Sequence, residues 1–175
     1  PPRLALRGWP LDKEPDMTTI TQSQSAHNNL GATPYGNLTA LHFVLETNAT
    51  GAAIHSNSTA AIAIGDVVRL GVLPAGVKLT DSQVVVQTGL TAAVTGKLGF
   101  AYTDGVDVVG VAAQDDDYFG TGLVLSAAAR LRNVTTNSAV TLPKDAYLTL
   151  TTAGAANAKA ARVEVTVLGI VQGVV

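Results

Sequence analysis

The stretch between residues 64 and 104 constrains the fold more than any other part of the chain, because it predicts three β-strands joined by turns. A Pro-Ala-Gly turn at 74–76 separates the first two strands, since proline presets φ and glycine accepts a positive φ. Three consecutive valines at 84–86 favour a pleated surface over a helix. Large apolar residues then alternate with small or polar ones, the period of a half-buried strand. The strands are expected at 67–73, 77–87 and 97–103.

Short apolar runs and turn residues continue on both sides of this stretch. The clearest example is 161–171, where three valines share one face and polar residues share the other. The run 123–134 is interpreted as a strand, although it is also compatible with a helix. Residues 106–112 are a short strand or a covering loop. Further strands are expected at 38–47, 60–64, 140–142 and 146–151, with loops at 48–59, 114–122 and 153–160.

Many short strands separated by turn signals predict an all-β fold, because the chain lacks the recurring amphipathic helices of a parallel βαβ fold. The first interpretation is an antiparallel β-sandwich, a jelly-roll-like domain of eight strands. An immunoglobulin-like Greek key is the alternative, although the Cys–Trp–Cys signature of that fold is missing. We expect residues 38–175 to form the sandwich, and residues 1–37 to form an extended N-terminal arm and an irregular segment.

The first sixteen residues differ from the rest of the chain, because they contain four of its seven prolines and its only tryptophan. Prolines at this density prevent a long helix and remove the N–H donors of a strand. An arm of this kind is ordered only where something holds it. We therefore expect it to lie along a neighbouring subunit, with Trp9 and Leu11 as apolar anchors and with Arg3 and Arg7 as charged contacts.

Charged residues make up only 14% of the chain, hydrophobic residues make up 47%, and the formal net charge is −2. A surface this poor in charge is weakly solvated, so a partner protein can cover it at low desolvation cost. The chain has no basic run of the kind that binds nucleic acid. It also has no cysteine, no apolar run of about 20 residues that suits a membrane helix, and no apolar core of a signal peptide. Composition therefore leaves two interpretations open, a surface that a partner protein covers and simply a β protein rich in small residues. It predicts neither nucleic-acid nor membrane partners.

Three consecutive aspartates, Asp115, Asp116 and Asp117, form the one acidic cluster of the sequence. Carboxylates presented by loops can bind hard cations such as Ca²⁺. Consecutive carboxylates point in divergent directions, however, and the alternating pattern of a calcium loop is missing, so we expect no metal. Two interpretations remain open: a solvated loop tip, and an electrostatic contact with a basic neighbour such as an arm that carries Arg3 and Arg7.

The chain contains no motif for catalysis or cofactor binding. The serines lack the nucleophile elbow, and the glycines form neither a P-loop nor a dinucleotide-binding fingerprint. His27, His42 and His55 are not at metal-ligand spacing with one another or with carboxylates. The sequence therefore predicts neither an enzyme nor a cofactor.

Three segments carry a resemblance to a known family. They are GDVVRLGVLPAGVKLTDSQVVVQTGL at 65–90, KLGFAYTDG at 97–105, and TLPKDAYLTLTT followed by ARVEVTVLG between 141 and 169. Together they resemble the capsid decoration, or cement, proteins of tailed bacteriophages over roughly residues 60–171. The proline-rich arm and the three aspartates are not part of this resemblance.

The resemblance implies a jelly-roll-like domain that binds the outside of an icosahedral capsid and clamps adjacent major capsid subunits, often as a dimer or trimer. The implied location is the virion surface, with the host cytoplasm during assembly. A carbohydrate- or receptor-binding jelly roll of a phage particle is the alternative. That role usually depends on aromatic platforms, and the chain has only one Trp, four Tyr and three Phe.

Overall fold

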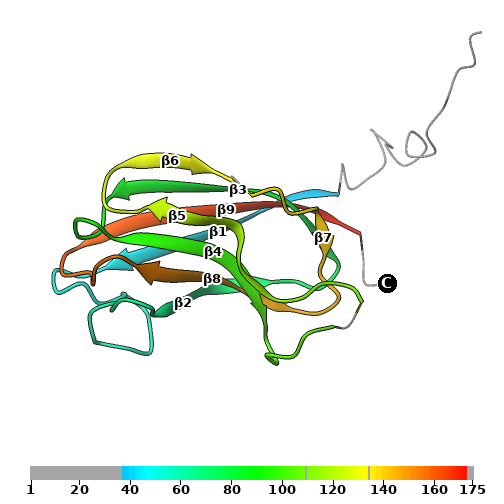
Figure 1. Ribbon diagram of the computed structural model, residues 1–175, viewed down its shortest axis with the longest axis horizontal. Helices are drawn as coiled ribbons and strands as arrows, with labels where there is room; N and C mark the ends of the chain where they lie inside the picture. The colour runs from blue at the N-terminus through cyan, green and yellow to red at the C-terminus, as the bar shows by residue number, and fades with distance from the viewer. Residues whose placement is uncertain (1–36, 109, 134, 173–175) are drawn as a thin grey trace, which may run out of the picture. The chain divides into compact units, whose positions relative to one another are not determined.

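The structure is a computed structural model that describes residues 37–172, apart from residues 109 and 134. The described residues form nine β-strands and no helix, and hence no helix that could span a membrane. The strands form two antiparallel sheets that pack face to face (Figure 1). In chain order they are β1 (Leu38–Thr47), β2 (Val67–Leu73), β3 (Val77–Thr88), β4 (Thr95–Tyr102), β5 (Asp115–Val124), β6 (Ala129–Arg132), β7 (Val140–Thr141), β8 (Ala146–Ala153) and β9 (Ala161–Val171).

The order of the strands in the two sheets is that of a jelly roll. One sheet has the order β1-β9-β3-β6, with the short strand β7 also paired to β3, and the other has the order β2-β8-β4-β5. The first strand therefore pairs with the last, the second with the last but one, and so on inwards to the β4–β5 pair. A long antiparallel hairpin that rolls into two sheets gives this nested pairing. The predicted all-β, antiparallel, jelly-roll-like sandwich is confirmed.

The core lies between the sheets and is built by the alternation that the sequence displays. Val163, Val165 and Val167 of β9 are completely buried, whereas the residues between them are partly exposed. In the other sheet, Leu98 and Phe100 of β4 are equally buried. Full burial of such a side chain contributes about 1.5–3 kcal/mol. The central strands of the two sheets therefore supply much of the force that holds the sandwich closed.

β5 is the main difference from the sequence prediction, which placed a loop at 114–122. The aspartates lie at the start of this strand and not at a loop tip. The strand is irregular, because Leu98 and Phe100, two residues apart on β4, pair with Gly120 and Asp115. The extra residues of this β-bulge break the alternation by which a strand is recognised. A bulged strand rich in aspartate and glycine therefore has the sequence pattern of a loop.

Three other predictions were wrong or inexact. The single strand predicted at 123–134 is wrong, because residues 123–132 are the end of β5, a bend and the four-residue strand β6. Residues 60–64 form no strand and contribute a single bridge to the loop after β1. Apart from residue 109, which the structure does not describe, residues 106–112 form a loop and no strand, with one bridge between Val108 and Ala112. The predicted arm lies outside the described residues, except for Asn37.

Candidate interaction surface

A groove of about 910 Å³ opens between β1, β2 and the segment that joins them. The end of β1, the start of β2 and loop residues between 53 and 62 form its walls. Each of the two strands is hydrogen-bonded to one neighbour only, because both lie at the edge of their sheet. The groove therefore lies on the side of the sandwich where each of the two sheets ends in an edge strand.

Exposed apolar side chains are concentrated on the same segment of the chain. The described residues include ten exposed large hydrophobic residues, and six of them belong to β1, β2 or the segment between them. Groups of exposed apolar side chains mark interaction sites more often than single ones do. The six are Leu38, Val44, Ile54, Ile64, Val67 and Val72. Three of them, Val44, Ile54 and Val67, line the groove, and we call these three residues and the groove the β1–β2 surface.

Gly71 allows the edge strands of the two sheets, β1 and β2, to pack closely beside this surface. Gly71 follows a bulge in β2, where the register with β8 shifts after Arg69. A Cβ atom at Gly71 would lie 2.4 Å from Cε1 of Phe43, closer than any side chain allows. Phe43 of β1 therefore packs its ring directly on the backbone of β2. This contact joins the two edge strands although no hydrogen-bond ladder connects them.

Asn157 fixes the loop that forms one wall of the groove. It is 2% exposed. Its amide donates hydrogen bonds to Thr47 Oγ1 at 3.1 Å and to the carbonyls of Gly51 and Lys159 at 3.3 and 2.9 Å. Its side-chain oxygen accepts a hydrogen bond from the N–H of Thr91 at 3.1 Å. One buried amide therefore connects the end of β1 with three loops, a role that its small-residue surroundings in the sequence did not indicate.

The predicted contact residues Asp115, Asp116 and Asp117 lie on β5, at the edge of the second sheet away from β2. Their bulge crosses directly over Gly99 of β4. A Cβ atom at Gly99 would lie 2.1 Å from the carbonyl oxygen of Asp115 and 2.4 Å from the carbonyl carbon of Asp116. Glycine at this position is therefore what allows the aspartates to take this place.

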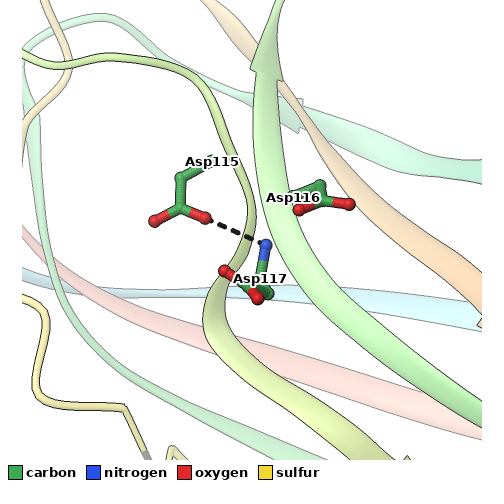
Figure 2. Close-up of side chains that lie close together, drawn as sticks. All are labelled: Asp115, Asp116 and Asp117. Atoms are coloured by element: carbon green, nitrogen blue, oxygen red, sulfur yellow. Dashed lines mark hydrogen bonds between the residues drawn. The ribbon is translucent and has the colours of Figure 1, made fainter.

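The three carboxylates lie close together, with one oxygen of each within 4.8 Å of the others (Figure 2). Asp115 accepts hydrogen bonds from the N–H of Asp117 at 3.1 Å and from Nδ2 of Asn137 at 3.2 Å. Asp116 forms an ion pair with Lys97 at 3.3 Å. Carboxylates are ligands that hard cations prefer. Here groups of the chain itself already engage two of the three, which favours a structural or contact role.

The pKa of Asp117 is raised above its ordinary value. The main cause is hydrogen bonding with the Asp115 side chain, followed by partial burial and by the negative charge of Asp115. The positive charge of Lys97 acts in the opposite direction but is the smallest cause. Negative charge is therefore crowded at this edge, and a basic partner would relieve it.

The remaining predicted contact residues, Arg3, Arg7, Trp9 and Leu11, lie outside the described residues. Contact between the arm and a neighbouring subunit stays a prediction, as does its pairing with the aspartates. Sequence analysis missed the groove and Asn157, because both depend on which strands become sheet edges.

Neither a protein-family model nor a curated protein matches the chain. Its fold is similar to that of chains in solved phage capsids. For a chain in the capsid of Ralstonia phage GP4, the similarity covers 79% of this chain and 86% of that chain, with 17% identity and a TM-score of 0.54. For a chain in the capsid asymmetric unit of cyanophage Pam1, it covers 91% and 98%, with 12% identity and a TM-score of 0.56. At these identities the likeness shows a shared fold, and function has to be argued from the surface.

Proposed function

We propose that the protein is a structural component of a phage virion that binds the outside of an icosahedral capsid and stabilises contacts between major capsid subunits. The observation that carries this proposal is the likeness to the Pam1 capsid chain, which extends over almost the whole of both chains. Coverage of 91% and 98% means that the two chains are similar in length. A single small domain of this fold is thus a chain of the Pam1 capsid, and we extend that role to this protein.

The surface of the domain supports the proposal. The β1–β2 surface combines exposed apolar side chains with a groove, in a chain of which only 14% is charged. The centre of a protein interface is depleted of charged residues in the same way. An interface of about 1,600 Å² is enough for specific attachment, and repetition across a symmetric shell adds avidity. Such attachment needs geometry and apolar area, and it needs no catalytic group.

The alternative, a carbohydrate-binding role, finds no support in the aromatic residues that the structure describes. The ring of Tyr147 is covered by the guanidinium group of Arg69, 4.6 Å from its centroid. Four other aromatic residues are buried in the core and cannot stack on a sugar. They are Phe100, Tyr102, Tyr118 and Phe119.

Charged groups beside the groove have structural partners, which supports a role without catalysis. Glu46 forms an ion pair with Arg162 on the outer face of the sheet. Asp66 accepts a hydrogen bond from the N–H of Ala63 at 2.7 Å and so holds the turn before β2. We therefore propose that the protein is not an enzyme. We also propose that its partner is the major capsid protein and that it reaches the virion surface from the host cytoplasm during assembly.

The experiment that tests this proposal uses particles of the phage that encodes the chain, purified with and without its gene. We expect the protein at a fixed ratio to the major capsid protein in the first sample. Particles without it should open at a lower temperature and after a milder osmotic shock. Absence of the protein from purified particles, or equal stability of the two samples, would overturn the proposal.

A further inference from the structure

β1 is an unprotected sheet edge, unlike the other edges that the structure describes. Exposed edges are usually short, bulged or charged, because their free N–H and C=O groups can pair with another strand. β2 has a bulge, and β5 has a larger one beside three aspartates. β6 has only four residues, of which two are arginines. β1 has ten residues, no proline or lysine, and an unbroken register with β9.

Hydrogen bonds at the two ends of β1 reveal which backbone groups face the open edge. In an antiparallel ladder, alternate residues turn both of their backbone groups to the same side. The C=O of Asn37 accepts the N–H of Val171 next to β9 at 2.8 Å, so odd-numbered residues of β1 face β9. The C=O of Glu46 accepts the N–H of Ile54 at 2.8 Å on the other side, so even-numbered residues face outwards. Among the residues that the structure describes, the open part of the edge therefore runs from residue 38 to residue 44.

We propose that this open edge pairs with the same edge of a second copy, about a two-fold axis at Leu41. Two copies of one strand that are related by such an axis are antiparallel, and the interface is isologous. With the axis at Leu41, Leu38 lies opposite Val44, and Ala40 lies opposite His42. All four of these residues turn both backbone groups to the partner, which gives about eight interchain hydrogen bonds.

The side chains fit the same register. Leu38 and Val44 are 68% and 40% exposed, and the two-fold axis brings each of them against the other. On the inner face, Leu41 meets its own copy beside the partly buried ring of Phe43. His42 is the one titratable residue of the open edge, and it lies opposite Ala40. The pairing therefore covers apolar side chains with apolar side chains and brings no like charges together.

Neighbouring registers are worse, and for this reason the proposal commits to one axis. An axis at His42 would put two histidines opposite each other and would require Glu46, whose C=O is already bonded by Ile54. An axis at Ala40 would leave Val44 without an opposite residue in the strand. A second copy thus matches the whole open edge, from Leu38 to Val44, without an unmatched backbone group.

Sedimentation and residue-resolved amide exchange on the full chain test the proposal. We expect a monomer–dimer equilibrium that depends on protein concentration. The amides of Ala40, His42 and Val44 should exchange more slowly as the dimer forms, whereas those of Leu41 and Phe43, bonded to β9, should be protected at every concentration. The proposal is overturned if the three outward amides exchange rapidly at all concentrations. It is also overturned if they are protected in the monomer, since another segment would then cover the edge.

Substitutions at His42 separate the backbone contact from the side chain. Proline is tolerated on an edge strand where the N–H faces solvent, so His42→Pro removes an outward donor and leaves the backbone bonds to β9 in place. Both His42→Pro and His42→Ala lose the contact of the imidazole with Thr166 Oγ1 of β9 at 3.2 Å, so this loss cancels in the comparison. His42→Pro should weaken the dimer about tenfold or more. His42→Ala, the matched control, should leave the dimer unchanged. Equal dimerisation of the two variants would overturn the proposal.

A charge pair tests the register and does not depend on the folding of a proline variant. Leu38→Glu and Val44→Lys should each weaken the dimer, because each places a charge opposite an apolar side chain. The double variant should dimerise more strongly than either single variant. The two-fold axis then gives two ion pairs, each between the glutamate of one copy and the lysine of the other. A double variant no stronger than the two single variants would overturn the register. All of these measurements use the isolated protein, so their outcome is independent of capsid binding.

Discussion

Replacement of Asn157 by alanine should destabilise the domain strongly, although the residue lies in a loop of small residues. Surface loops usually tolerate substitution. Asn157, however, is 2% exposed, and its side chain bonds with groups on separate segments. The substitution therefore tests whether the buried side-chain amide of Asn157 stabilises the loops beside the β1–β2 surface.

The expected loss follows from the individual bonds of Asn157. Each such bond contributes about 0.5–1.5 kcal/mol net. The freed carbonyls keep second donors, because Gly51 accepts a backbone N–H at 3.1 Å and Lys159 accepts the hydroxyl of Thr47 at 2.8 Å. The partly buried N–H of Thr91 loses its acceptor and adds a desolvation cost. We expect a total loss of about 3 kcal/mol, which lowers Tm by about 6–12 °C in a chain of this size.

Urea and thermal unfolding followed by circular dichroism measure this loss. Asn57→Ala, at an exposed position of the loop after β1, is the matched control and should change the free energy of unfolding by about 0.5 kcal/mol or less. Asn157→Asp keeps the shape but turns a carboxylate towards the carbonyls of Gly51 and Lys159. It should be at least as destabilising as alanine at pH 7. A loss of less than about 1 kcal/mol for Asn157→Ala would refute the reasoning, because its bonds would then be replaceable by water.

Three further substitutions test the bulge of β5 and its surroundings. Gly99→Ala must displace the backbone of the aspartate cluster and should cost about 1–3 kcal/mol in thermal unfolding; an unchanged Tm would contradict the packing. The pKa of Asp117 is raised in the folded protein, so its protonated side chain stabilises the fold below the ordinary pKa of aspartate. This stabilisation is lost as the pH rises through the pKa of the folded protein. Asp117→Asn should therefore stabilise the protein at pH 7 and have little effect near about pH 3, and an equal effect at both would be contrary evidence. Tyr118→Phe removes a hydroxyl that donates to the C=O of Ser138 at 2.8 Å and accepts from the N–H of Val140 at 3.2 Å. It should cost about 1–2 kcal/mol by urea unfolding, and no measurable loss would argue against those bonds.

The regular strands of the fold were predictable from the sequence, because one face of each is buried against the opposite sheet. In β9 the buried valines alternate with Arg162, Glu164 and Thr166, and this period of two survives in the structure. β5 was not predictable in the same way. Its bulge depends on the close approach of its backbone to Gly99, a contact between two different strands that the local sequence does not show. Alternation of apolar and polar residues along a strand indicates which side chains are buried. The pattern is lost where a bulge shifts the register of two strands.

The candidate surface was less predictable than the fold. The aspartates stand out by composition, but their position beside Lys97 and Asn137 follows from strand pairing and the return of a loop. The apolar segment 38–47 has the pattern of a strand, yet nothing in it indicates whether it becomes central or an edge. That distinction depends on the nested pairing of all nine strands.

Once the topology is known, the distribution of charge over the first sheet becomes informative. Natural edge strands usually carry charges that discourage pairing, whereas central strands have no need of them. At the β1 edge this order is reversed, because the central strand β9 presents Arg162 and Glu164 on its outer face, while the open part of β1 has only His42. The opposite edge, β6, carries two arginines and follows the usual rule. A protein that acts alone gains nothing from the arrangement at β1. One whose edge is covered by a partner in its working state avoids the cost of burying unpaired charges there.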